Sequence, residues 1–123
     1  MTGGTQLETM KIAEARRYAL TLPEVTEEPH FHLSSFRVRG KIFATVPPDE
    51  EHLHIFVDEQ ERELAIAVNP RACEKLKWGK QVAGLRVILA NAKVADVKDL
   101  LHSAWRRKAP KSLAKTLERS RPK

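Results

Sequence analysis

The sequence predicts a two-layer α+β domain with an antiparallel sheet, and two observations support this fold class. Segments with the apolar spacing of helices alternate with short segments of strand character, in the order α-β-β-β-α-β-β-α-α. Two pairs of strands are joined by connections that contain a glycine, Gly40 in the first and Gly79 in the second. Helices mixed with hairpin-linked strands favour an antiparallel sheet that is covered by helices on one face.

Composition agrees with one small globular domain. The chain has 123 residues, of which 41% are apolar and 31% charged, a balance typical of folded rather than disordered proteins. Cys73 is its one cysteine, which excludes an intrachain disulfide and favours a reducing compartment such as the cytoplasm. Neither a signal peptide nor an apolar run long enough to span a membrane is recognisable. We therefore expect a cytoplasmic protein that does not associate with membranes.

The first expected element is a helix. Thr5-Gln6-Leu7-Glu8 fits a capping box, which would start the helix at this point. Apolar residues then recur at helical spacing at Ile12, Ala15, Ala19 and Leu22. Pro23 ends the helix, and residues 24–29 are interpreted as an acidic connector.

Three strands are expected next, at residues 35–38, 41–46 and 52–57. Arg39-Gly40 suits a tight hairpin turn, and Pro47-Pro48-Asp49 breaks the second strand. In the third strand, Leu53, Ile55 and Val57 alternate onto one face.

The first hairpin has two possible registers. A loop of Arg39-Gly40 alone pairs Val38 with Lys41 and places Phe43 on the face of Phe36. A loop that also includes Lys41 pairs Val38 with Ile42 and gathers Phe36, Val38, Ile42, Ala44 and Val46 on one face. We prefer the second register because it buries more apolar surface, although turn chemistry does not settle the choice.

The second half of the chain repeats the pattern of helix, hairpin and helix. Asp58 caps a helix, with Glu61 placed to reach back to its start, and Asn69-Pro70 ends it. Residues 71–78 and 85–90 are expected to be strands, joined by a connection that includes Gly79 and Gly84. Asp96 is expected to cap a third helix, whose apolar stripe consists of Val97, Leu100, Leu101 and Ala104. Pro110 then separates a short final helix over residues 111–119.

Positive charge is concentrated at the end of the chain. The net charge of the whole chain is +6, but residues 106–123 carry eight lysines and arginines against Glu118. The other 105 residues have 14 basic and 15 acidic groups. Such a one-sided field suggests a polyanionic partner, whereas composition alone favours a solvated end. We therefore divide the chain into a domain over residues 1–109 and a basic helical tail over residues 110–123.

Several segments resemble the MmcQ/YjbR family. The main one is Ser35-Phe36-Arg37-Val38-Arg39-Gly40-Lys41-Ile42-Phe43-Ala44. The segment Ala19-Leu20-Thr21-Leu22-Pro23-Glu24-Val25 with Glu27 resembles the first helix of that family and its exit. Trp78-Gly79-Lys80, the strand around Val87, and Ala104-Trp105-Arg106 resemble its later landmarks. The match spans roughly residues 10–110.

The resemblance implies an α-β(3)-α-β(2)-α fold like that of type III secretion chaperones. It also implies DNA binding, with hairpin wings proposed to contact the duplex, although a fold by itself does not fix function. The tail after Pro110 lies outside the clearest resemblance.

Basic residues on the hairpins and the last helices are the candidate DNA contacts, because lysine and arginine pair with phosphates and release counterions. They are Arg37, Arg39, Lys41, Lys77, Lys80, Arg86, Arg106, Arg107, Lys108, Lys111 and Lys115, with Arg119 further along the last helix. An ordinary basic surface is the alternative, and sequence-specific recognition is unsupported.

Other kinds of site are disfavoured. His30, His32, His52 and His54 could bind zinc only if the two pairs were adjacent, and neighbouring acids such as Glu27 and Glu28 are interpreted as solvated charges. Cys73 suits a small core residue better than a nucleophile. Ser34 and Ser35 lie near His32 but suit strand turns. We expect no enzyme, no metal and no cofactor.

A protein-interaction module is the second function class that the sequence allows. Trp78 or Trp105 could anchor such an interface, but Trp105 is expected to pack in the core beside Leu101. The sequence therefore predicts a small protein that binds DNA with little sequence specificity, with a protein- or peptide-binding module as the alternative.

Overall fold

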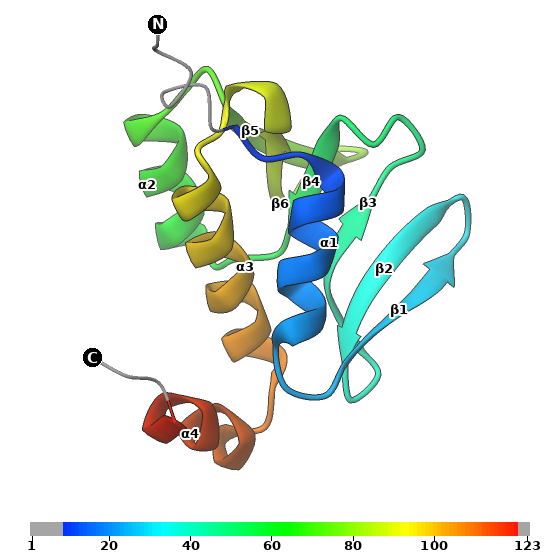
Figure 1. Ribbon diagram of the computed structural model, residues 1–123. Coiled ribbons are helices and arrows are strands. Elements are labelled where there is room, and N and C mark those ends of the chain that lie inside the picture. Colours follow the sequence, from blue (N-terminus) through cyan, green and yellow to red (C-terminus); the bar gives the residue numbers. More distant parts are fainter. Residues whose placement is uncertain (1–8, 121–123) are drawn as a thin grey trace, which may run out of the picture.

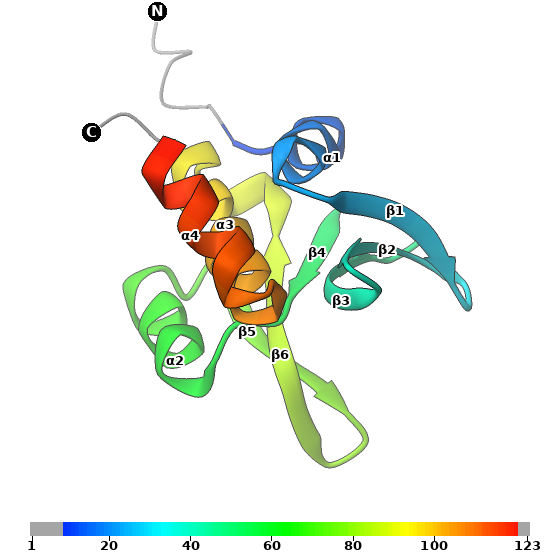
Figure 2. The same ribbon diagram turned by 90° about the horizontal axis from the view of Figure 1, so that it is seen from below.

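A six-stranded antiparallel sheet carries its helices on one face (Figures 1 and 2). The computed structural model describes the backbone of residues 9–120 and the side chains of residues 9–116. Its elements are α1 (Ile12–Thr21), β1 (Val25–His30), β2 (Leu33–Val38), β3 (Lys41–Val46), β4 (His52–Ile55), α2 (Glu59–Val68), β5 (Cys73–Trp78), β6 (Gln81–Ile88), the 3-10 helix η2 (Leu89–Asn91), α3 (Val94–Lys108) and α4 (Lys111–Ser120). The strand order is β1-β2-β3-β4-β6-β5, so the α+β prediction is confirmed.

The edge strand β1 was not predicted, and the interpretation of residues 24–29 as a connector is wrong. The strand pairs with β2 from Val25 opposite Val38 to His30 opposite Leu33. An edge position tolerates Pro29, which has no N–H for a ladder. Glu27 is not a solvated charge, because its carboxylate accepts hydrogen bonds from Arg16 Nε at 2.9 Å and from the Ser34 hydroxyl at 2.7 Å.

The first hairpin combines the two registers, because the alternative holds at the turn and the preferred one holds from the pair of Phe36 and Ala44 onward. Val38 pairs with Lys41 around a two-residue turn, in which Arg39 and Gly40 have φ values of 50° and 82°. Two consecutive positive φ values are typical of the tight turn whose twist matches that of the strands.

A bulge in β3 preserves the apolar face in spite of this register. Arg37 faces Ile42 but Phe36 faces Ala44, which leaves Phe43 as the extra residue. Phe36 and Phe43 are both fully buried, with ring centroids 6.5 Å apart. The bulge therefore places both aromatic rings in the core.

The second hairpin is longer than expected because Gly84 belongs to a strand and not to the loop. β6 begins at Gln81, which pairs with Trp78 across a turn of Gly79 and Lys80. A Cβ atom on Gly84 would lie 2.8 Å from Cδ1 of Phe56 and 3.0 Å from the carbonyl oxygen of Ile55. The glycine therefore allows the Phe56 ring to pack directly on the β6 backbone.

The start of α1 differs from expectation. The capping box expected at Thr5-Gln6-Leu7-Glu8 lies outside the described residues. Thr9 forms an isolated bridge with Lys93, so α1 begins only at Ile12, where Glu14 accepts a hydrogen bond from the Lys11 N–H at 3.3 Å. The extended backbone at Thr9 overrides the predicted start.

Two boundaries around α3 also differ from expectation. Asp96 does not cap the helix, which begins two residues earlier at Val94 and leaves Asp96 in its first turn. A carboxylate in the first turn still interacts favourably with the helix dipole. Leu89 and Ala90 continue β6 as a 3-10 turn and not as a strand.

Other helix signals are confirmed. Pro23 follows the end of α1, and α2 ends before Asn69-Pro70. The Asp58 carboxylate accepts a hydrogen bond from the Glu61 N–H at 2.8 Å. The Glu61 carboxylate does not bind the backbone at the start of α2, however, because it accepts a hydrogen bond from the Ser103 hydroxyl of α3.

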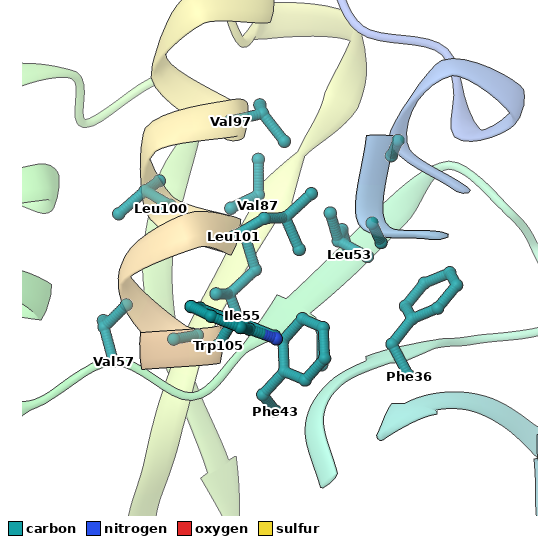
Figure 3. Close-up of a cluster of buried hydrophobic side chains, with 14 of the residues drawn as sticks. Phe36, Phe43, Leu53, Ile55, Val57, Val87, Val97, Leu100, Leu101 and Trp105 are labelled. Atoms are coloured by element: carbon teal, nitrogen blue, oxygen red, sulfur yellow. The ribbon is translucent and has the colours of Figure 1, made fainter. Parts of the chain in front are cut away.

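The core lies between the sheet and the two helices α1 and α3 (Figure 3). All four residues of the predicted apolar stripe on α3 are buried, as is Trp105. In Figure 3 Leu101 and Trp105 point toward Ile55 of β4, beside Phe43. The indole Nε1 of Trp105 donates a hydrogen bond of 3.1 Å to the Pro23 carbonyl, which joins the end of α3 to the α1–β1 loop.

The final helix packs against the rest of the fold. Ala109 ends α3, and α4 follows directly after Pro110. Ala109 and Ala114 are buried members of the main core cluster, and Leu113 packs against it. The first half of α4 is therefore held in a defined position next to the end of α3 (Figure 2).

Candidate nucleic-acid interface

The largest group of predicted DNA contacts lies where α3 meets α4. Arg106, Arg107 and Lys108 form the last turn of α3, where positive charge is favourable next to the negative end of the helix dipole. On α4, Lys111 and Lys115 are exposed and one helical turn apart, whereas Ala114 packs inward. We call the five cations Arg106, Arg107, Lys108, Lys111 and Lys115 the basic end.

Hydrogen bonds and buried residues hold the basic end in place. Arg107 Nη1 donates a hydrogen bond of 2.8 Å to the Phe56 carbonyl, just after β4. Trp105, one turn before Lys108, is fully buried and bonded to the α1–β1 loop. The backbone that carries the positive charges is therefore fixed relative to the sheet.

The β2–β3 turn lies at the same end of the molecule, next to the α1–β1 loop (Figure 1). Arg39 binds Glu24 in that loop through two hydrogen bonds of 2.7 and 3.0 Å. The hydrogen bond with Arg39 holds the pKa of Glu24 below its usual value. Exposed ion pairs of this kind contribute little to stability, so Arg39 can exchange Glu24 for another anion. Lys41, two residues after Arg39, is exposed.

Arg37 and Arg86 do not join this group, because Arg86 belongs to a polar row across the face of the sheet opposite the helices and Arg37 is hydrogen-bonded to that row. One residue of each strand contributes to the row: Glu28, Ser35, Thr45, His54, Arg86 and Glu74, in strand order. Arg37 Nε donates a hydrogen bond of 2.9 Å to the Ser35 hydroxyl, and Arg37 Nη2 donates one of 3.2 Å to the Pro29 carbonyl.

Arg86 is the central cation of this polar row. Its Nε lies 3.7 Å from a Glu74 carboxylate oxygen, and that buried Nε has no hydrogen-bond partner among the described residues. Both arginines therefore interact mainly with the sheet.

Lys77 and Lys80 lie on the β5–β6 hairpin, a third location. Figures 1 and 2 place the tip of this hairpin away from α4. Both side chains are exposed. The eleven predicted contacts thus fall on three parts of the surface, and the basic end together with Arg39 and Lys41 holds seven of them.

His54 is the most perturbed titratable group of the polar row. It is 8% exposed, and its Nδ1 lies 3.2 Å from the Thr45 hydroxyl. Burial lowers the pKa of His54 from 6.5 to about 4, with further contributions from the positive charges of Arg86 and His52. The imidazole is therefore neutral at physiological pH.

This low pKa predicts a pH-dependent stability. His54 becomes protonated below pH 6.5 in the unfolded chain but only near pH 4 in the folded chain. The contribution of neutral His54 to the free energy of unfolding is therefore complete above pH 6.5 and is lost as the pH falls toward 4. Urea unfolding of the wild type should show this loss, and His54→Gln should reduce the slope in this window. A His54 ring that titrates near pH 6.5 by NMR would contradict the assignment.

The other candidate sites have ordinary surroundings. His52 Nδ1 lies 3.0 Å from an Asp49 carboxylate oxygen, and His30 packs edge-on against the Phe31 ring. Among the side chains of residues 9–116, no three of histidine, cysteine, aspartate or glutamate converge as metal ligands would. Burial, followed by the charge of Asp96, raises the pKa of the Cys73 thiol, which is the opposite of what an activated nucleophile needs.

The two tryptophans differ as expected. Trp105 is fully buried, whereas Trp78 is 55% exposed and contacts the Phe56 ring edge-on, with centroids 5.7 Å apart. In the described part of the chain, no helix is long and apolar enough to cross a membrane.

Two features of the molecular surface were not predicted from the sequence. The pairing of Glu24 with Arg39 depends on a contact between distant loops, and no local signal indicates it. The exposed apolar residues of α2, Leu64 and Val68, were also overlooked. Their signal was present, because Leu64–Val68 is an uninterrupted apolar run in a surface helix.

Comparisons with known proteins agree with the observed fold. The YjbR family model matches residues 20–107. The crystal structure of Deinococcus radiodurans protein DR2400, which has a DUF419 domain, is similar with a TM-score of 0.71 and 18% identity, over 92% of this chain and 91% of that one. No curated protein matches. The family model covers most of the chain, and the chain therefore belongs to the YjbR family.

Proposed function

We propose that this YjbR-family protein binds DNA through the phosphate backbone, with little sequence specificity and without catalysis. The observation that carries the proposal is the fixed cluster of five cations at the basic end, on two consecutive helices that are packed onto the core. Arg39 and Lys41 extend this surface at the same end of the molecule. A reducing cytoplasmic compartment would suit both the DNA target and the single thiol of Cys73.

The physical basis is the release of counterions. Each phosphate that a lysine or arginine neutralises frees condensed cations from the duplex. Phosphate contacts fix the position of a protein on DNA but carry no sequence information. An array of lysine and arginine on a fixed backbone therefore supports binding that depends on charge and hardly on base sequence.

Fluorescence anisotropy with a labelled short duplex tests this proposal. If the basic end makes five phosphate contacts, log K should fall against log salt concentration with a slope of about −4.5. Duplexes of unrelated sequence should bind within about threefold of one another. The absence of binding at low salt, or affinity that is insensitive to salt, would overturn the proposal.

A further inference from the structure

An apolar groove separates α2 from α3, on the helical face of the molecule. Its volume is about 200 Å³. Leu64 and Val68 of α2 form one wall, Val97 and Leu100 of α3 form the other, and Cys73 and Val87 lie at its base on the sheet. Figure 1 shows the two helices side by side over β5 and β6. We call this feature the α2–α3 groove.

The α2 wall of the groove is unusually open. No residue of α2 is buried, although a surface helix normally buries one apolar stripe. Leu64 and Val68 are 63% and 72% exposed, one helical turn apart. Exposed apolar side chains that gather along a groove are typical of interaction sites.

Hydrogen bonds near each end hold α2 in position. The Ser103 hydroxyl of α3 donates to the Glu61 carboxylate of α2. Beyond Val68, Asn69 Nδ2 donates a hydrogen bond of 3.4 Å to the Asn91 carbonyl, and Asn91 Nδ2 donates one of 2.8 Å to the Arg71 carbonyl. Together with the packing of Ala65 and Ile66 against the core, these bonds keep the groove from closing.

The size of the groove favours side chains over a whole small molecule. Pockets that enclose drug-sized ligands usually measure about 300–1,000 Å³, which is more than this groove provides. A groove between two helices suits the apolar face of a third helix, in which side chains at i and i+4 insert as anchors.

The charge around the groove identifies the chemistry of its partner. Its three charged lining residues, Glu61, Asp96 and Asp99, are all acidic, in a chain whose net charge is +6. Lys98, between Asp96 and Asp99 in sequence, extends toward the Tyr18 ring of α1, with Nζ 5.5 Å from the ring centroid. The rim therefore attracts a positively charged partner.

We propose that the α2–α3 groove binds an amphipathic helical segment of another protein, with an apolar face flanked by lysine or arginine. Its apolar anchors would pack between Leu64, Val68 and Leu100, and its cations would pair with Asp96 and Asp99. The groove lies near the N-terminal half of α3, whereas the basic end comprises the C-terminal turn of α3 and part of α4. DNA and the peptide would therefore bind to separate surfaces.

A model peptide of leucine and lysine at helical spacing, about 18 residues long, is the probe. A peptide of leucine and glutamate with the same apolar face is its matched control. The lysine peptide should bind at least about tenfold more tightly at low salt, and the difference should shrink in about 0.5 M salt. Equal binding of the two peptides, or no binding of the lysine peptide, would overturn the proposal.

Variants localise the binding to the groove. Leu64→Ser with Val68→Ser should weaken lysine-peptide binding by more than about tenfold, because both apolar side chains of the α2 wall are removed. Asp96→Asn with Asp99→Asn should weaken it several-fold at low salt only. Leu20→Ser, at a 44% exposed apolar position on α1, is the matched control and should leave it unchanged. If the serine pair binds like the wild type, the proposed site is wrong.

Cys73 provides a second readout inside the groove, because it is the single cysteine of the chain. Saturation with the lysine peptide should slow the alkylation of Cys73 by about tenfold. An unchanged alkylation rate would place the peptide elsewhere. If the free protein instead proved to be a dimer that the double substitution Leu64→Ser with Val68→Ser dissociates, a second copy of the chain would occupy the groove. The proposal of a separate partner would then be wrong.

Discussion

Reversing the charge of Lys108, Lys111 and Lys115 to glutamate is expected to weaken DNA binding by more than about 100-fold at low salt. Lys108 lies half-buried in the last turn of α3, and Lys111 and Lys115 are exposed on α4. Each reversal leaves one phosphate without its cation and adds repulsion, so the salt slope should fall by about 0.9 for each substituted lysine. Anisotropy titrations at several salt concentrations measure both quantities.

The matched control reverses Lys77 and Lys80 on the β5–β6 hairpin. These lysines are also exposed but lie away from α4, so their reversal should change affinity by no more than about threefold. Circular dichroism should show that both variants remain folded. A hairpin variant that loses as much affinity as the α3–α4 variant would show that the duplex contacts the hairpin, and our assignment of the interface to the basic end would be wrong.

Trp105→Ala is expected to destabilise the fold by about 3–5 kcal/mol, the usual cost of removing a fully buried aromatic side chain. The indole is 0% exposed and lies between the sheet and the end of α3 (Figure 3). Its Nε1 also donates the hydrogen bond to the Pro23 carbonyl. Urea unfolding followed by far-ultraviolet circular dichroism measures the decrease in the free energy of unfolding.

Trp78→Ala is the matched control, since it removes the other tryptophan of the chain from a position that is 55% exposed. It should cost less than about 1.5 kcal/mol, mainly the ring contact with Phe56. Trp105→Phe separates packing from hydrogen bonding and should cost less than Trp105→Ala. If the two alanine variants were equally stable, Trp105 would not have the central role in the core that its burial implies.

The distribution of charge along α3 relates the two proposed surfaces. Asp96 and Asp99 near its N-terminus line the α2–α3 groove, whereas Arg106, Arg107 and Lys108 occupy its last turn. Asp96 in the first turn and the three cations in the last turn are favourably placed with respect to the helix dipole. One helix can therefore present an acidic surface to a basic peptide and a basic surface to DNA, and the two experiments can fail independently.

Several features could be predicted from the sequence because they depend on neighbouring residues. Pro23, Asp58 and Pro110 mark helix boundaries through local backbone sterics and capping. The apolar stripe of α3 identifies its buried face by helical spacing alone. These signals, with the family resemblance, were sufficient for the fold class.

Only the tertiary structure decided the features that depend on residues distant in sequence. The strand β1 forms because β2 supplies an edge and Arg16 and Ser34 bind Glu27. The register of the first hairpin requires a bulge at Phe43, whose ring needs the space beside Trp105.

The candidate interface also depends on contacts between residues that are distant in sequence. The sequence contains the eleven candidate cations without indicating which of them share a surface, and the fold places the tip of the β5–β6 hairpin away from α4 (Figure 2). Periodicity and caps are local properties, so the sequence by itself determined the presence and order of the α-helices and the total charge. Strand pairing and charge placement depend on long-range contacts, which exist only in the folded chain.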